Sequence, residues 1–327
     1  MSPGDPGEQL RHRPSVPMPL TVDPVSGRAA GPRSGGSAGG VSGAGRGPDA
    51  DDTRFQSDCA RCVALCCSAL AFSRGDDFAH EKPAGKPCRN LDENLGCSIH
   101  AVLLERGYRG CTVFECHGAG QRVTQETFGG GDWREGEGLR DAMFAVFPLV
   151  RQLHEVLWLL TEARRRTADR PLLRRIDALF DRVDAQAASP DVAVLRAAVE
   201  SSRPAAGELL GAVSREVRRA HAPRRRASGA WSRVEPRGVY LGTDFSGGDL
   251  RAVELRGALL IAAKLRGADL RWADLLGADL RDAELHGADL RHVLHLTQPQ
   301  LAAAFGDATT QLPDSLTRPR HWKGGRR

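Results

Sequence analysis

Eight cysteines lie between positions 59 and 116, and the rest of the 327-residue chain has none. Thiolates are the ligands of structural zinc sites and of iron–sulfur clusters. Eight of them are enough for two closed sites of four ligands each. The candidate ligands are Cys59, Cys62, Cys66, Cys67, Cys88, Cys97, Cys111 and Cys116, and His80, His100 and His117 are candidates to replace individual cysteines.

A disulfide scaffold is the other interpretation of dense cysteines, and it belongs to secreted proteins. The N-terminus has no basic segment followed by an apolar one, so no secretory signal peptide is expected. We therefore predict a cytoplasmic protein with reduced cysteines. Zinc is the expected metal, iron or an iron–sulfur cluster is the alternative, and cysteines without metal are the third interpretation. Few core-forming residues surround the cysteines, so metal binding would supply much of the folding free energy.

This stretch also resembles a family of cysteine-cluster domains described as zinc- or iron-chelating. Three elements match in order: CRNL from Cys88, CSIH from Cys97 and CTVFEC from Cys111. The early cluster departs from the family pattern by one residue, because three residues separate Cys62 from Cys66. The resemblance implies metal ligation and implies no activity.

A five-residue repeat fills residues 239–295. A large apolar residue stands at every fifth position from Phe245 to Leu290, and a small residue stands two places before nearly all of these ten positions. A period of five fits neither a strand nor an α-helix, and short repeats of this kind build stacked solenoids. The string GADLRWADLLGADLRDAELHGADL resembles the pentapeptide-repeat family. That resemblance implies a right-handed quadrilateral β-helix of about two and a half coils.

Four repeats per coil would stack residues that are twenty positions apart. Asp249, Asp269 and Asp289 would then form one column beside a column of arginines, a pattern typical of a solvated, ion-paired face. Four outward positions are apolar, which makes them candidates for a partner-binding patch, although isolated exposed apolar residues are common. They are Leu259, Ile261, Trp272 and Leu276.

The composition predicts a multi-domain chain. A leader over residues 1–54 is rich in glycine, proline and serine, so disorder is expected there, and Met18 is an alternative start. The segments that follow are a cysteine-rich metal-binding domain (55–138), a helical segment (139–214), a basic linker (215–238), the repeats (239–295) and a C-terminal cap and tail (296–327). Helices are expected over 139–166, over 171–185, from Ser189-Pro190-Asp191 onward and, as a cap, over 298–305.

Three classes of function are consistent with these segments. The first is a non-catalytic, metal-binding adaptor or regulatory protein with a protein partner, and the second is a metal-dependent or redox protein that uses the cysteines. The third is a DNA mimic that protects gyrase, but residues 239–295 hold nine acidic and seven basic side chains, a net charge of only −2. Nucleic acid could be contacted only through the basic linker. The most apolar stretch, residues 143–160, is interrupted by polar residues, so no membrane span is expected.

Overall fold

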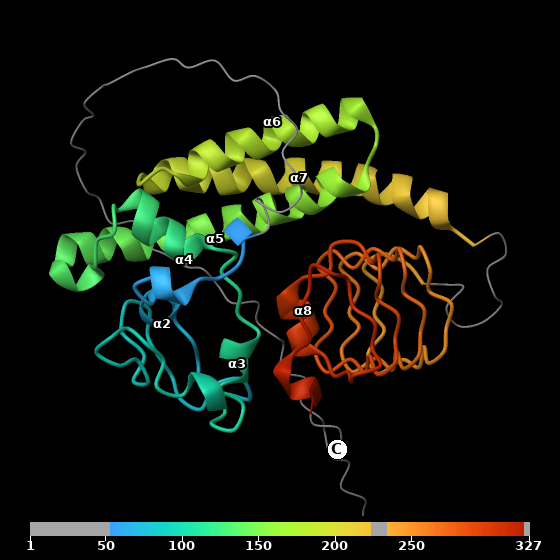
Figure 1. Ribbon diagram of the computed structural model, residues 1–327, viewed down its shortest axis with the longest axis horizontal. Coiled ribbons are helices and arrows are strands. Elements are labelled where there is room, and N and C mark those ends of the chain that lie inside the picture. Colours follow the sequence, from blue (N-terminus) through green and yellow to red (C-terminus); the bar gives the residue numbers. More distant parts are fainter. Residues whose placement is uncertain (1–52, 224–233, 324–327) are drawn as a thin grey trace, which may run out of the picture. The chain divides into compact units, whose positions relative to one another are not determined.

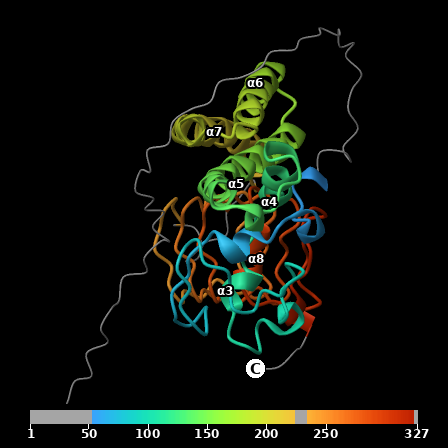
Figure 2. The same ribbon diagram turned by 90° about the vertical axis from the view of Figure 1, so that its left-hand side faces the viewer.

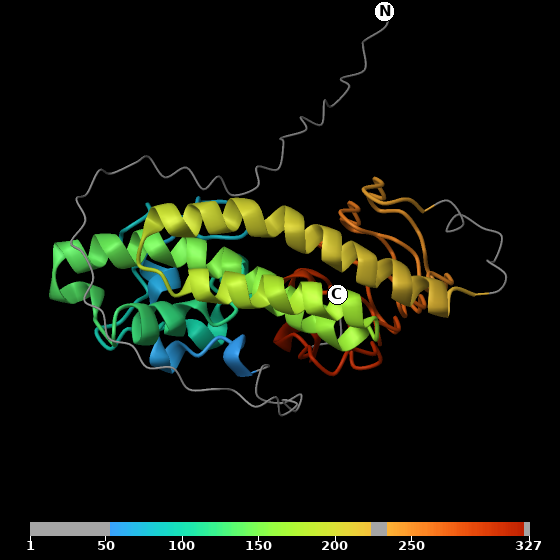
Figure 3. The same ribbon diagram turned by 90° about the horizontal axis from the view of Figure 1, so that it is seen from above.

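The described structure contains three long helices: α5 (Glu137–Arg166), α6 (Arg170–Ala187) and α7 (Val192–His221). They run side by side in the computed structural model, which describes residues 53–223 and 234–323 (Figures 1 and 3). Viewed nearly end-on in Figure 2, the three helices occupy the corners of a triangle. Their fully buried residues, including Leu157, Ile176 and Val213, form one core. All described residues belong to a single compact unit of the chain.

The starts of the second and third helices follow from capping aspartates. Asp169 accepts a hydrogen bond from the backbone N–H of Leu172 at 3.2 Å, and Asp191 accepts one from Ala193 at 2.7 Å. The third helix therefore begins after Asp191 rather than at Ser189. It runs to His221, so residues 215–221 are helical although the sequence suggested a linker. Residues 224–233 of that linker, and nearly all of the leader, lie outside the described residues.

Among the described helices, α5 is long and apolar enough to cross a membrane, judged by length and composition alone. More than half of its most apolar window is buried within the structure. Leu153, Leu157 and Leu160 are completely buried in the core that α5 shares with α6 and α7. A core helix meets the same criterion, so the absence of a membrane span stays a prediction.

The cysteine-rich region consists mainly of loops joined by short helices. These are α2 (Leu65–Ser68), α3 (Arg109–Thr112) and α4 (Ala119–Arg122). Isolated antiparallel bridges, such as Phe72 with Lys82, tie the loops together. Phe55, Leu65 and Val123 enter the core of the three long helices, so this region shares its hydrophobic core with the helices.

The predicted β-helix over residues 239–295 is wrong. The described part of the chain contains no β-strand, and its regular secondary structure is helical. The β-bridges between successive turns of the described repeat region are all isolated parallel bridges between single residues. The physical reason is the spacing of the turns, because a left-handed residue recurs every five positions, as at Gly257, Ala262 and Gly267. Only one residue of each five-residue repeat forms a bridge to the neighbouring turn, which is too few for a strand.

The stacking of residues twenty positions apart is nevertheless confirmed. Bridges join Asp249 to Asp269 and Asp269 to Asp289. The side chain of Arg251 lies 2.7 Å from Asp249 and 3.6 Å from Asp269, so the acidic and basic columns pair with each other. The large apolar residues from Phe245 to Leu290 are all at most 1% exposed and form a second core inside the stack.

The C-terminal segment closes this second core. Helix α8 (Gln298–Ala303) starts as expected, because Thr297 and Gln300 form a capping box, and Leu301 is fully buried. Phe305 does not act as a cap, since its side chain is 39% exposed while its backbone bridges to Glu284. The indole of Trp322 is buried in this core instead.

Candidate functional site

The eight cysteines are divided equally between the short helices of the cysteine-rich region and the loops that connect them. Cys59 opens a single 3-10 turn (Cys59–Arg61), Cys66 and Cys67 lie on α2, and Cys111 lies on α3. The remaining cysteines lie in the connecting loops. All eight are free thiols, and only Cys59 is classed as exposed.

Four cysteines gather near the start of α4, and we call Cys59, Cys62, Cys66 and Cys116 the first set. The backbone N–H of Cys62 donates to the carbonyl of Cys59 at 3.3 Å. A Cβ atom added at Gly120 would lie 2.7 Å from Cys62 Sγ and 3.9 Å from Cys116 Sγ, so this glycine faces both sulfurs. Burial and the charge of Cys116 raise the pKa of Cys62 to about 11.

The other four cysteines, Cys67, Cys88, Cys97 and Cys111, form the second set. The backbone N–H of Cys88 donates to Cys67 at 2.9 Å. Leu91 bridges to Cys97, which holds the two loop cysteines of this set together. Burial, followed by the charges of Cys67, Cys88 and Cys97, raises the pKa of Cys111 to about 12. The two sets adjoin at Cys66 and Cys67, whose sulfurs are 3.8 Å apart.

These sets are neighbourhoods of thiols and not formed coordination spheres. Within residues 53–223 and 234–323, no group of three or more histidine, cysteine, aspartate or glutamate side chains converges closely enough to hold a metal ion. A tetrahedral site with zinc–sulfur bonds of about 2.3 Å needs sulfurs about 3.8 Å apart. Cys66 and Cys67 have that separation, but they belong to different sets, so their distance marks where the two sets adjoin and not a pair of ligands of one ion.

A buried lysine lies beside the second set. Lys82 is 3% exposed, and its ammonium donates to the carbonyls of Ser68 at 3.2 Å, Pro83 at 3.3 Å and Lys86 at 2.7 Å. Burial lowers the pKa of Lys82, while the charge of the nearby Cys88 raises it. No carboxylate of the described residues pairs with this ammonium, so thiolates are the anions available to it. Sequence reasoning missed Lys82, because a lysine in the polar stretch EKPAGKP is expected to be solvated.

The three candidate histidines have other surroundings. His80 Nδ1 hydrogen bonds to the Tyr108 hydroxyl at 2.9 Å, and His100 is exposed. His117 is buried, with its ring centroid 5.5 Å from that of Trp158. Burial lowers the pKa of His117. None of the three forms a metal-holding group with the cysteines in the part of the chain that the structure describes.

The four apolar positions proposed for a partner surface divide into two pairs. Leu259 is 38% exposed and Ile261 is partly exposed. Trp272 and Leu276 instead pack against the core of the three long helices. The indole of Trp272 stacks on the ring of His221, the last residue of α7, at a centroid distance of 4.5 Å. The chain's own helices therefore cover one pair.

A buried ionic network joins α7 to the repeats next to this contact. Asp274 is completely buried, and its carboxylate lies 2.9 Å from His295 Nδ1 and 2.8 Å from Arg256 Nε. Arg256 also points at the carbonyl of Gly207 on α7, 3.5 Å away. Burial alone would raise the pKa of Asp274, but the hydrogen bond from His295 and the charges of His295 and Arg256 outweigh it and lower the pKa to about 2.

Comparison with known proteins identifies the repeats and one extended relative. The family described as "Pentapeptide repeats" matches residues 242–275 and 263–294, with eight copies. The chain is 44% identical over 269 residues to the "Uncharacterized protein YybG" of Bacillus subtilis (strain 168), which covers 82% of this chain and 95% of the relative. No solved structure matches the chain.

The similarity to YybG extends well beyond the repeats. Positions 239–327 make up only 89 residues, so at least 180 of the 269 aligned residues precede position 239. The metal-chelating family that the cysteine region resembles is not among the matches found. The chain therefore belongs to the same family as its Bacillus subtilis relative, with which it shares most of its length, and it carries pentapeptide repeats over residues 242–294.

Proposed function

We propose that this protein is a non-catalytic, metal-binding protein in which each cysteine set holds one zinc ion. The observation that carries the proposal is that eight free thiols, spread over 58 positions of the sequence, lie near enough for the charge of one to raise the pKa of another, and we assign them to two adjoining groups of four. Four thiolates are the ligands of a closed structural zinc site. Such a site has no open position for a substrate, so the proposal assigns no catalytic residue.

Two neighbouring residues fit this ligand chemistry. Gly120 leaves room for the sulfur of Cys62, which a Cβ atom 2.7 Å away would displace. Zinc with four thiolates carries two excess negative charges, and the buried ammonium of Lys82 would offset part of that charge at the second set. Lys82 would then act as an outer-sphere partner of the site.

Metal binding requires the sulfurs of each set to move closer to one another. The loops that carry the second set have few large buried residues of their own, with Leu103 and Tyr108 as the exceptions between positions 83 and 111. Loops of this kind lose little packing when they rearrange, so the free energy of metal binding would become folding free energy. Free thiols persist in reducing compartments, and we therefore place the protein in the cytoplasm.

The proposal also includes a protein partner at the start of the repeat region. Leu259 and Ile261 stay accessible there, and Val239 and Leu241 beside them are 64% and 54% exposed. Val239 bridges to Leu259, so these side chains lie on adjacent turns. An apolar protein surface is the expected occupant, which would make the chain an adaptor or regulatory protein. Neither a membrane nor nucleic acid is part of this proposal.

Elemental analysis of the full chain, purified anaerobically, tests the metal content and the ligand pairing together. We expect about two zinc ions per chain and no visible absorbance. The double variant Cys62→Ser/Cys116→Ser changes two ligands of one set, so it should keep one zinc ion. The matched double variant Cys62→Ser/Cys111→Ser changes one ligand of each set and should lose both.

Each other result has a definite meaning. Equal zinc loss in the two double variants would contradict the assignment of ligands to sets. A wild-type chain without metal would contradict metal binding altogether. Iron with sulfide and a broad absorption band would replace zinc by an iron–sulfur cluster and favour a redox function.

A further inference from the structure

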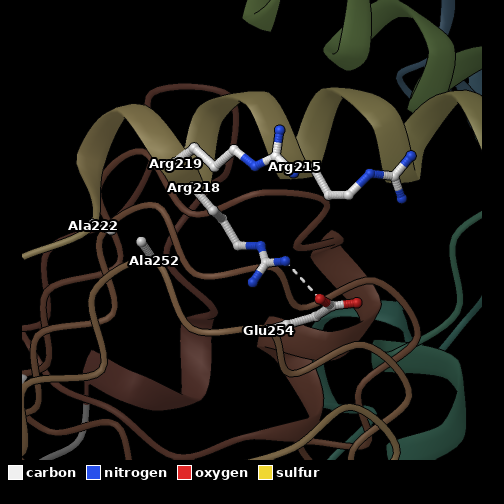
Figure 4. Close-up of a pocket in the computed structure, with 6 residues that line it drawn as sticks. All are labelled: Arg215, Arg218, Arg219, Ala222, Ala252 and Glu254. Carbon is white, nitrogen blue, oxygen red and sulfur yellow. Dashed lines mark hydrogen bonds and ion pairs between the residues drawn. The ribbon is translucent and has the colours of Figure 1, made fainter.

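A basic cleft lies between the last turns of α7 and the early turns of the repeat region. Its hollow has a volume of about 300 Å³ and is lined by Arg215, Arg218, Arg219, Ala222, Ala252 and Glu254 (Figure 4). Three arginines and one glutamate give this lining a net charge of +2.

The carboxylate in the cleft is already paired. Arg218 reaches down to Glu254, with Nη2 and Oε2 2.5 Å apart, and its Nε also bonds to the Ser214 hydroxyl at 3.2 Å (Figure 4). Arg215 and Arg219 are exposed, and neither has an ion pair or hydrogen bond with the described residues. Their two charges are therefore uncompensated within the described structure.

The acidic groups on the other side of these two arginines are occupied as well. Arg215 and Arg219 also line a neighbouring hollow of about 550 Å³ together with Asp169 and Glu216. Asp169 caps the start of α6 through the N–H of Leu172. Glu216 accepts a hydrogen bond from the Thr167 hydroxyl at 2.5 Å. Both carboxylates thus accept hydrogen bonds from other groups, and in the described structure neither forms an ion pair with Arg215 or Arg219.

Favourable interaction with the helix dipole explains the position of only some of these arginines. Basic residues are favourable in the last turn of a helix, which covers Arg218 and Arg219. Arg215 lies one turn earlier, at the spacing that places it on the same face as Arg219. The paired arginines of the repeat columns differ, because Arg271 and Arg291 each have an aspartate within 2.7 Å.

We propose that this cleft binds a small phosphate-bearing anion through Arg215 and Arg219. Guanidinium groups form paired, charge-assisted hydrogen bonds with phosphate oxygens, and two of them suit a diphosphate. Arg218 would neutralise Glu254 so that the glutamate does not repel the ligand. Free inorganic phosphate, diphosphate and the phosphates of a nucleotide share this chemistry, whereas a hollow of this size has no room for a duplex.

Isothermal titration of the full chain with inorganic pyrophosphate, in a buffer without phosphate, tests the proposal. We expect saturable binding of one pyrophosphate per chain, and at least tenfold weaker binding by the double variant Arg215→Ala/Arg219→Ala. Arg196→Ala is the matched control, because Arg196 is also exposed on α7 and has no partner among the described residues. The control should bind like the wild type. Both substituted sites are exposed, so circular dichroism should show unchanged folding.

Parallel titrations with orthophosphate and with a nucleoside triphosphate distinguish the sources of the phosphate group. Tighter binding of the triphosphate than of pyrophosphate would assign a nucleotide, and equal binding would assign the free diphosphate. No saturable binding by the wild type would overturn the proposal. The same conclusion would follow if Arg196→Ala weakened binding as much as the double variant, because the interaction would then be nonspecific.

Discussion

Replacement of Asp274 by asparagine should destabilise the protein more than any comparable change on the repeat surface. The Asp274 carboxylate is completely buried between Arg256 and His295, and it also accepts the backbone N–H of Leu276 at 3.0 Å. Asparagine keeps the shape of the side chain but removes its charge. The guanidinium of Arg256 then loses the charge that compensates it, and an uncompensated buried charge is costly.

The size of the effect follows from the pKa of this carboxyl. Its pKa falls from an ordinary value of 3.8 to about 2 in the folded protein. Each tenfold change in a dissociation constant corresponds to about 1.4 kcal/mol, so the charge contributes about 2 kcal/mol to the free energy of unfolding. Breaking the buried pair costs about 3–5 kcal/mol in comparable proteins. We therefore expect Asp274→Asn to cost about 2–4 kcal/mol at pH 7.

The lowered pKa of Asp274 determines how the stability difference between the wild type and Asp274→Asn depends on pH. A carboxyl whose pKa is lowered by folding stabilises the protein fully above its unfolded pKa, and this stabilisation is lost as the pH falls through the folded pKa. The difference in stability between the wild type and Asp274→Asn should thus be constant above pH 4. It should narrow between pH 4 and pH 2, as Asp274 of the wild type becomes protonated.

Urea unfolding followed by circular dichroism, at pH 7 and at several values below pH 4, measures this difference. Asp279→Asn is the matched control, because Asp279 occupies the same place in the next repeat and pairs with Arg281, whose side chain is 47% exposed. An exposed pair contributes less than about 1 kcal/mol. Equal costs for the two variants at pH 7, or a difference that stays unchanged down to pH 2, would refute the reasoning.

Three further changes test other parts of the structure. Gly120→Ala should release one of two bound metal ions, because the added Cβ atom would displace the sulfur of Cys62. Elemental analysis measures the loss, and Gly207→Ala is the control that should keep both ions, because the space around its Cβ is open. Lys82→Met should let a chelator remove the second-set metal at about tenfold lower concentration, as loss of an outer-sphere partner does, and an unchanged chelator titration would contradict this role. Leu270→Ala removes a fully buried side chain from the repeat core and should cost about 2–5 kcal/mol in urea unfolding.

The repeat register could be predicted from the sequence because the backbone itself repeats every five residues. That period places Leu260, Leu270 and the other large residues inside, and it brings residues twenty positions apart together. The five-residue period does not indicate how many residues of each repeat pair with the neighbouring turn. The structure has single-residue bridges where strands were expected. The contribution of the tail has no periodic signal either. Trp322 enters the core only because residues 304–322 fold back over the last turns.

The long helices could be predicted from apolar spacing and capping residues, but the end of α7 could not. A run of arginines is equally compatible with a solvated linker and with an exposed helix face. The end of α7 is helical, and two side chains of its last turns, Ser214 and Val217, are buried although the neighbouring Arg215 and Arg219 are exposed. The same tertiary packing covers Trp272 and Leu276. A repeat sequence marks which side chains point outward, but not which of them another element covers.

The cysteine spacing identified eight candidate ligands without dividing them into sets, because the division depends on how the loops that carry Cys88, Cys97 and Cys111 return to α2. The structure adds an asymmetry between the sets. Cys62, Cys66 and Cys116 pack against the core of the three long helices, whereas the second set lies outside that core.

This asymmetry gives the two proposed metal sites different structural consequences. Sulfurs that draw together in the first set would move residues that contact the core around α5, and α5 in turn shares that core with Trp272 and Leu276 of the repeat region. Movement in the second set would stay among loops joined by isolated bridges. The repeat region has its own core and needs neither site for its internal packing. A metal in the first set would therefore stabilise the packing of the long helices against the cysteine-rich region and the repeat region. A metal in the second set would order only the loops that carry it.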